Sequence, residues 1–238
     1  MGCHHEKLDE NGVLDFDLGG FLVRTGDRVV LIDAGAGDVT DLLLPHGGRY
    51  SGGTFLDSLR SYGLTPEDVT DVCLTHLHWD HVGWASHKGE VVFPNATYRL
   101  HETEWDHFVE RGNASPAVLT SMLPVKNRIE PFSEDFTVAP GLDSLHTPGH
   151  TPGSVSYVVS QGKRRAIMLG DVVHSVVELE ERDWEALYDV DPSAASAVRN
   201  LIADEAADTE DLVVGAHFPD LRFGRLVTID GERRFRPV

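Results

Sequence analysis

Cysteine and long apolar runs are scarce in this sequence of 238 residues. Only Cys3 and Cys73 occur, so the chain lacks the disulfide framework that holds small secreted domains together. No apolar run approaches the roughly 20 residues that span a bilayer. No basic start followed by an apolar centre marks a signal peptide. These scarcities predict a cytoplasmic protein without a membrane partner.

Basic residues are also few, with 20 lysines and arginines against 39 aspartates and glutamates, for a net charge of −19. A nucleic-acid-binding protein needs basic patches for the phosphate backbone, and only the short groups 163–165 and 233–234 gather such residues here. The acidic excess therefore argues against a nucleic-acid partner and favours a neutral or weakly charged small-molecule substrate. Whether the protein is a monomer or a homodimer stays open at this stage.

The remaining composition is that of one globular domain. Hydrophobic residues make up 41% of the chain, 23 glycines supply turns, and neither a tandem repeat nor a low-complexity segment interrupts residues 1–238. Hairpins are expected around Gly26 and around Gly162, because apolar segments flank both turns. A helix is expected from Pro192 to about Ala206, with Asp191 as its cap.

A dense group of polar residues, the segment 75–83 (THLHWDHVG), follows the apolar segment 69–74. Residues two apart on an extended chain point the same way, so His76 and His78 can approach one metal ion together. A turn at Trp79 would direct Asp80 and His81 toward a second ion. So many groups that require solvation or a partner are rarely buried as structural filler, which predicts a site for two metal ions.

The other ligands are expected at the ends of later strands. His150 lies in the turn 146–153 (HTPGHTPG), whose prolines and glycines fix its angle, and is the expected third ligand of the first ion. Asp171 ends the hydrophobic segment 165–171, where a carboxylate can bridge two cations. His217 ends the segment 212–217 and would join Asp80 and His81 at the second ion.

This order of residues resembles the metallo-β-lactamase superfamily of binuclear metal hydrolases, across nearly the whole chain. The resemblance implies an α+β fold, a four-layer αββα sandwich with the metal pair at one sheet edge. It also implies two divalent ions, with Zn²⁺ first and Mn²⁺, Fe²⁺ or Co²⁺ as alternatives, because imidazole and carboxylate suit all four. The expected ligands are His76, His78, Asp80, His81, His150, Asp171 and His217.

Within that superfamily, the motifs 170–174 (GDVVH), 188–192 (YDVDP) and 216–219 (AHFP) are similar to a branch that contains methyl parathion hydrolase and acyl-homoserine lactonases. A bridging Asp171 argues against antibiotic hydrolysis, since the β-lactamases of the superfamily do not use one. Lactonases of this branch place a tyrosine three residues after the bridging acid, whereas this chain has His174.

The expected chemistry is hydrolysis by a water that two ions share and convert to hydroxide. Asp80 is predicted to accept the proton of this water and to pass it to the leaving group. His174 is expected either to be a second proton donor or to support the ligands from outside the ligand set. A small ester, a lactone or a phosphotriester would fit. The segment 101–134, rich in aromatic residues, is expected either to form a wall of the substrate pocket or to pack on the core.

Two other functions stay open. One is a thioesterase of the glyoxalase II type, although the chain lacks the basic cluster at its end that an anionic glutathione conjugate would require. The other is a di-iron redox protein, whose relatives usually carry an acid where His78 stands. A protein that binds metal but has lost catalysis would be expected to lack ligands, and none of the seven is missing.

Overall fold

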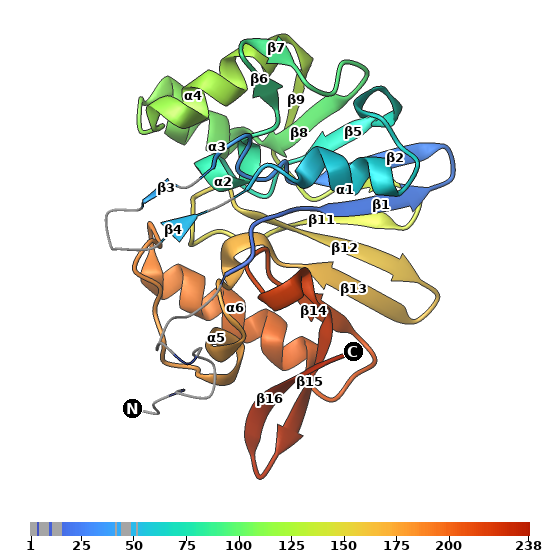
Figure 1. The fold of residues 1–238 in the computed structure, drawn as a ribbon. Coiled ribbons are helices and arrows are strands. Elements are labelled where there is room, and N and C mark those ends of the chain that lie inside the picture. The colour runs from blue at the N-terminus through green and yellow to red at the C-terminus, as the bar shows by residue number, and fades with distance from the viewer. Residues whose placement is uncertain (1–3, 5–9, 11–15, 41, 44–48, 51) are drawn as a thin grey trace.

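The fold consists of two mixed β-sheets that face each other, with helices on the outer side of each sheet (Figure 1). The computed structural model describes residues 4, 10, 16–40, 42–43, 49–50 and 52–238. The first sheet, in the order β1-β2-β5-β8-β9, comes from the first part of the chain, and the second, β10-β11-β12-β13-β14-β15-β16, from the rest. The predicted four-layer α+β sandwich is therefore confirmed.

The strands of both sheets are short. Those of the first sheet are β1 (Phe21–Thr25), β2 (Arg28–Ile32), β5 (Asp71–Cys73), β8 (Thr97–His101) and β9 (Ile129–Phe132). Those of the second are β10 (Thr137–Ala139), β11 (Leu142–His146), β12 (Val155–Gln161), β13 (Arg164–Met168), β14 (Leu212–Val214), β15 (Gly224–Ile229) and β16 (Glu232–Pro237). Two short ribbons pair β3 (Leu42–Leu43) with β4 (Arg49–Tyr50) and β6 (Ser86–His87) with β7 (Glu90–Val91).

Most of the described helices are short. The α-helices are α1 (Phe55–Ser61), α2 (Trp79–Val82), α3 (Glu102–Trp105), α4 (Pro116–Met122), α5 (Val176–Glu180) and α6 (Pro192–Ala206). Single turns or short runs of 3₁₀-helix occupy Pro66–Asp68, Leu123–Arg128, Gly170–Val172 and Pro219–Leu221, and a π-helix occupies Asp106–Glu110. None of the helices in the described ranges has both the length and the apolar character needed to cross a membrane.

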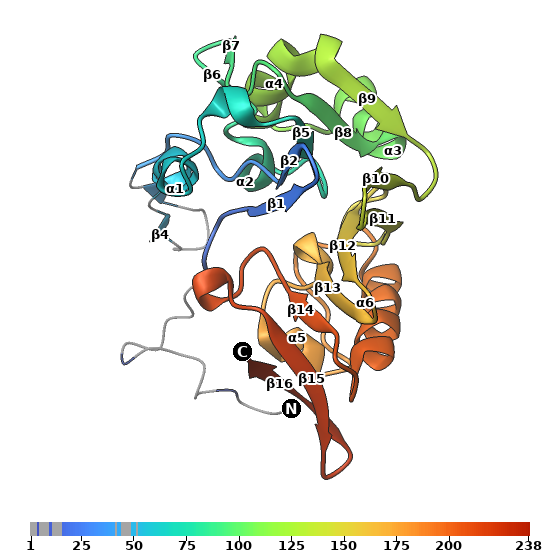
Figure 2. The same cartoon turned by 90° about the vertical axis from the view of Figure 1, so that its right-hand side faces the viewer.

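The core lies in two layers because the strands of the first sheet are buried on both faces. Val30 and Ile32 of β2 join the cluster between the two sheets, whereas Leu31 joins the cluster under α1, α2 and α4. Alternate residues of a strand point to opposite faces, so one apolar run serves both clusters. The cluster that contains Val30 and Ile32 continues past the second sheet, where α6 on the far side contributes Ile202 and Ala203 (Figure 2).

Parallel pairing brings several strand ends to one edge of the sandwich. In the first sheet β2 runs parallel to β5, with Ile32 opposite Cys73. In the second, β13 runs parallel to β14, with Met168 opposite Val214. The residues that follow these four strands therefore meet at the same edge, as the carboxyl ends of parallel strands do.

Local expectations were met to different degrees. Both predicted hairpins and the helix Pro192–Ala206 are present, and the Asp191 side chain accepts a hydrogen bond from the Ala194 N–H. Within the segment 101–134, residues 102–110 and 116–128 are helical, and residues 129–132 form the edge strand β9. Pro131 is tolerated there since an edge strand need not donate every N–H.

Candidate metal centre

All seven predicted ligands meet at the edge described above, and the structure divides them into two groups. His76, His78, His150 and Asp171 form the first group, in which the potential ligand atoms all lie within 4.8 Å of one another. Asp80, His81 and His217 form the second group under the same limit. This division is the one that the sequence predicted, with Asp171 between the groups.

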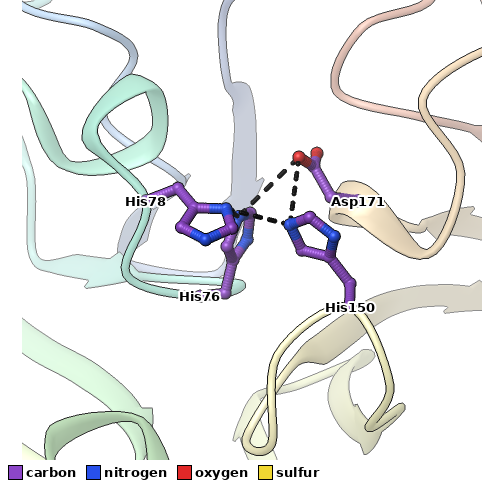
Figure 3. Close-up of side chains that lie close together, drawn as sticks. All are labelled: His76, His78, His150 and Asp171. Carbon is purple, nitrogen blue, oxygen red and sulfur yellow. Dashed lines mark hydrogen bonds and ion pairs between the residues drawn. The ribbon is translucent and has the colours of Figure 1, made fainter. Parts of the chain in front are cut away.

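In the first group, three ring nitrogens and one carboxylate oxygen face a common point (Figure 3). His78 Nδ1 lies 3.0 Å from His76 Nε2 and 2.9 Å from His150 Nε2. Asp171 Oδ2 lies 3.7 Å from His76 Nε2 and 3.5 Å from His150 Nε2. The two histidines of the first sheet and the histidine of the second thus form one donor set.

The second group faces the other oxygen of the same carboxylate. Asp171 Oδ1 lies 3.2 Å from His81 Nε2 and 3.1 Å from His217 Nε2. Asp80 Oδ2 lies 3.7 Å from His217 Nε2 and 3.9 Å from His81 Nε2. His217 Nε2 also lies 3.2 Å from Asp171 Oδ2. Asp171 therefore contacts both groups, with Oδ1 facing the second group and Oδ2 lying between the two, as expected of a bridging ligand.

Hydrogen bonds on the far side of the rings fix which nitrogen carries the proton. His81 Nδ1 lies 2.8 Å from Asp33 Oδ2, and His150 Nδ1 lies 3.0 Å from Asp189 Oδ1. His217 Nδ1 lies 3.0 Å from the main-chain oxygen of Asp17. Since these oxygens only accept, each Nδ1 donates, and in the neutral ring the lone pair is on Nε2.

These Nε2 atoms point at Asp171, which itself offers only lone pairs when ionised. Burial alone would lower the pKa of His81 and of His217, but Asp171 outweighs it and raises both, so a divalent cation would take the place of a proton on these nitrogens. Within the described part of the chain, His81 Nε2 and Asp171 Oδ1 are buried and have no hydrogen-bond partner. Burial and neighbouring rings hold the pKa of His76 well below its usual value and that of His78 at about 4. Both rings therefore stay neutral and keep a lone pair for a metal ion. The residues present therefore fit divalent cations, which would compensate the facing lone pairs.

Gly170 allows the bridging carboxylate to turn into the site. Its φ is +55°, in the left-handed region, and a Cβ there would lie 2.8 Å from Thr75 Cβ. Larger residues are disfavoured on both counts. Thr75 is in turn fixed by Asp33, whose Oδ1 accepts its main-chain N–H at 2.7 Å, so the ligand segments of the two sheets fit closely against each other.

His174 lies at the rim of the centre, outside both ligand groups as the sequence defined them. Its Nε2 is 3.5 Å from Asp171 Oδ2, its Nδ1 is 3.5 Å from Glu178 Oε2, and 15% of its side chain is exposed. Burial alone would lower the pKa of His174, but Asp171 and Glu178 outweigh it and raise the pKa to about 9. His174, His150 and Asp189 also form a third cluster of potential ligands.

Aromatic side chains surround the centre. Phe108 of the π-helix places its ring edge-on to His78, with 5.5 Å between centroids, and Phe16 does the same to His217 at 6.1 Å. Irregular π-helical turns often occur at functional sites. A cavity of about 810 Å³ begins beside Phe16 and Asp17 and extends between β1 and α1, and its walls combine polar and apolar surface.

Several residues that support the ligands were not identified from the sequence. Asp33 follows the apolar strand β2 as Asp171 follows β13, so the same strand-end pattern could have revealed it. Asp189 and Glu178 act through contacts with His150 and His174 that no local pattern encodes. Glu104, fully buried on α3, also lacked a local signal.

Comparison with known proteins gives one family. Residues 20–217 match the model of the metallo-beta-lactamase superfamily. An N-acyl homoserine lactonase of a Bacillus species is 26% identical over 180 residues, which are 69% of this chain and 67% of the relative. Metallo-beta-lactamase domain-containing protein 1 of Xenopus laevis is 28% identical over 207 residues, 87% of this chain and 76% of the relative.

Solved structures show the same architecture. The hydrolase AbOPH of the beta lactamase superfamily superposes with a TM-score of 0.83 at 27% identity, over 98% of this chain and 83% of that one. The dizinc quorum-quenching lactonase AidC superposes with a TM-score of 0.79 at 24% identity, over 94% of this chain and 80% of that one. The latter similarity, at this identity, concerns the fold alone.

Proposed function

Because the chain belongs to the metallo-beta-lactamase superfamily, we propose that it is a binuclear metal-dependent hydrolase of small, neutral esters or lactones. The observation that carries the proposal is the Asp171 carboxylate, which lies between two groups of imidazole nitrogens and contacts both. We propose Zn²⁺ as the native ion, in two positions that share this carboxylate.

The surroundings support a neutral substrate with an apolar part. The aromatic rings of Phe108 and Phe16 lie against His78 and His217. The net charge of −19 disfavours anionic substrates in general. A lactone or ester also agrees with the similarity to the Bacillus N-acyl homoserine lactonase, whereas the glutathione thioester of the alternative function would carry negative charge.

The residues of the chain have separate tasks in this reaction. When bound, two divalent ions would lower the pKa of a water between them and polarise the substrate oxygen. The Asp80 carboxylate faces this space and can accept a proton, while Asp33 and Asp189 hold His81 and His150 in the required tautomers. His174, partly exposed at the rim, is placed to donate a hydrogen bond or proton to the leaving oxygen.

Metal content and substrate preference test the proposal together. Elemental analysis of untagged protein should give about two ions per chain, as expected for a two-metal site. The same preparation should hydrolyse lactones or aryl esters faster than phosphotriesters, glutathione thioesters or a β-lactam. Two bound ions without hydrolysis of any member of the panel would favour the di-iron redox alternative, and no metal after reconstitution would exclude the binuclear centre.

Substitution of His174 separates catalysis from metal binding. His174→Ala should lower kcat by about 100-fold, the lower end of what a positioned proton donor contributes, and should leave metal content unchanged. His174→Gln keeps a hydrogen-bonding group but cannot supply a proton, so it should behave like the alanine variant if His174 transfers one. Loss of metal from His174→Ala would instead make His174 a ligand.

A further inference from the structure

A buried carboxylate, Glu104, connects the two loops that carry the first group of ligands. Its Oε2 accepts a hydrogen bond from the Leu77 N–H at 3.0 Å, and its Oε1 accepts one from the Gly153 N–H at 2.7 Å. Leu77 lies between His76 and His78, and Gly153 lies three residues after His150. Glu104 is 0% exposed, so these contacts are made without water.

The two loops belong to different sheets. The Leu77 loop follows β5 of the first sheet, whereas the Gly153 loop connects β11 and β12 of the second. Two other links join these sheets through the main chain of β5 and the residues after it: the Val155 N–H donates to the Thr75 oxygen, beside His76, and the Tyr157 hydroxyl donates to the Leu74 oxygen. Glu104 bridges the loops at the ligands themselves.

From this geometry, and given the metal centre of the proposed function, we infer that Glu104 is the positioning residue that sets the distance between the His76–His78 pair and His150. The side chain hydrogen-bonds to the main chain of the two loops and to the Thr151 side chain, and to none of the three imidazoles. Partners of ligand loops of this kind typically change metal affinity by about 10- to 100-fold when they are altered.

The chemistry of the contacts requires a carboxylate. Both main-chain partners are N–H donors, so the side chain must offer an acceptor on each side. A glutamine has one oxygen and one NH₂ group, and its NH₂ group would face a second donor. Glu104→Gln therefore keeps the size of the side chain but breaks one of the two links, at the cost of an unsatisfied buried donor.

Gly153 shows how closely the two parts fit. A Cβ at this position would lie 2.8 Å from the Glu104 main-chain nitrogen and 2.9 Å from Glu104 Cγ. Gly153→Ala would therefore push the loop that carries His150 away from the carboxylate while leaving Glu104 itself in place. It provides a second, independent way to disturb the same link.

The test measures metal binding directly. Wild-type and Glu104→Gln protein are stripped of metal, titrated with Zn²⁺ against a competing chelator, and loaded with Co²⁺ for visible absorption spectra. We expect the first site to lose about 10- to 100-fold in affinity, with a changed Co²⁺ spectrum. Gly153→Ala should change both in the same direction, and it replaces Glu104→Gln if that variant does not fold.

Asp71→Asn is the matched control. Asp71 is also a fully buried carboxylate, which accepts hydrogen bonds from Arg28 Nε at 2.9 Å and Arg99 Nε at 3.1 Å. It lies at the start of β5, at the opposite end from the ligands, so its substitution should lower Tm without changing Zn²⁺ affinity or the Co²⁺ spectrum.

The outcomes separate this inference from the proposed function. If the wild-type protein binds no Zn²⁺, the metal centre itself is refuted. If the wild-type protein binds two ions and Glu104→Gln binds them with the same affinity and spectrum, only the positioning role is refuted, and Glu104 contributes to folding in the same way as Asp71.

Discussion

Replacement of Asp171 by asparagine is expected to remove nearly all hydrolytic activity together with most of the bound metal. Asp171 is the only predicted ligand that faces both groups, with Oδ1 3.1 Å from His217 Nε2 and Oδ2 3.5 Å from His150 Nε2. An asparagine offers one acceptor oxygen instead of two and has no charge to offset two adjacent cations. Substitution of a residue that contacts a ligand but not the metal typically costs at most about 100-fold. The loss in kcat/KM for Asp171→Asn should exceed this value.

The measurement is kcat/KM with the best substrate of the panel, alongside elemental analysis of the same samples. Asp189→Asn provides a graded comparison, because Asp189 contacts the far nitrogen of His150 and would not touch the ions. Its effect should stay within about 10- to 100-fold. An Asp171→Asn variant with full activity would overturn the bridging role.

Removal of metal should cause the largest change in thermal stability. The seven donors come from four separate stretches of chain, so only the folded protein presents them together. At 1,000 times Kd, one ion adds about 4 kcal/mol to the free energy of unfolding. For a chain of this size that corresponds to a fall in Tm of roughly 8–16 °C when the ion is removed.

Calorimetric scans in excess Zn²⁺ and in excess chelator measure this difference. Asp171→Asn is the control, since its Tm should hardly depend on chelator if it no longer binds the ions. Equal Tm values for wild-type protein under both conditions would show that the site adds nothing to the stability of the fold.

The sequence was informative where residues that can bind a metal directly follow a strand. His76 and His78 are two residues apart after a strand, so their common direction followed from backbone geometry alone. Asp171 and His217 could be found because each follows an apolar segment that ends at the same sheet edge. The boundaries of α6 followed from local signals, with Asp191 as cap and Pro192 in the first turn.

The sequence was uninformative where a partner is set by tertiary contact. Glu104 lies on a helix of one turn, and nothing nearby in sequence indicates that it meets Leu77 and Gly153. Thr65 and Asp68 form a capping box with Pro66 in the first turn, yet the segment is a single 3₁₀ turn, Pro66–Asp68, because the chain must extend at once to enter the sheet as β5. Sheet pairing thus overrode a good capping signal.

The division of the ligands between the two sheets has a consequence for the lifetime of the folded chain. His76 and His217 are far apart in sequence, and closing a loop of that length costs entropy before any ion is held. Ions that require both sheets in place can bind only after the sheets have docked. When bound, they would therefore act mainly by slowing the unfolding of the native state, and little by speeding its formation.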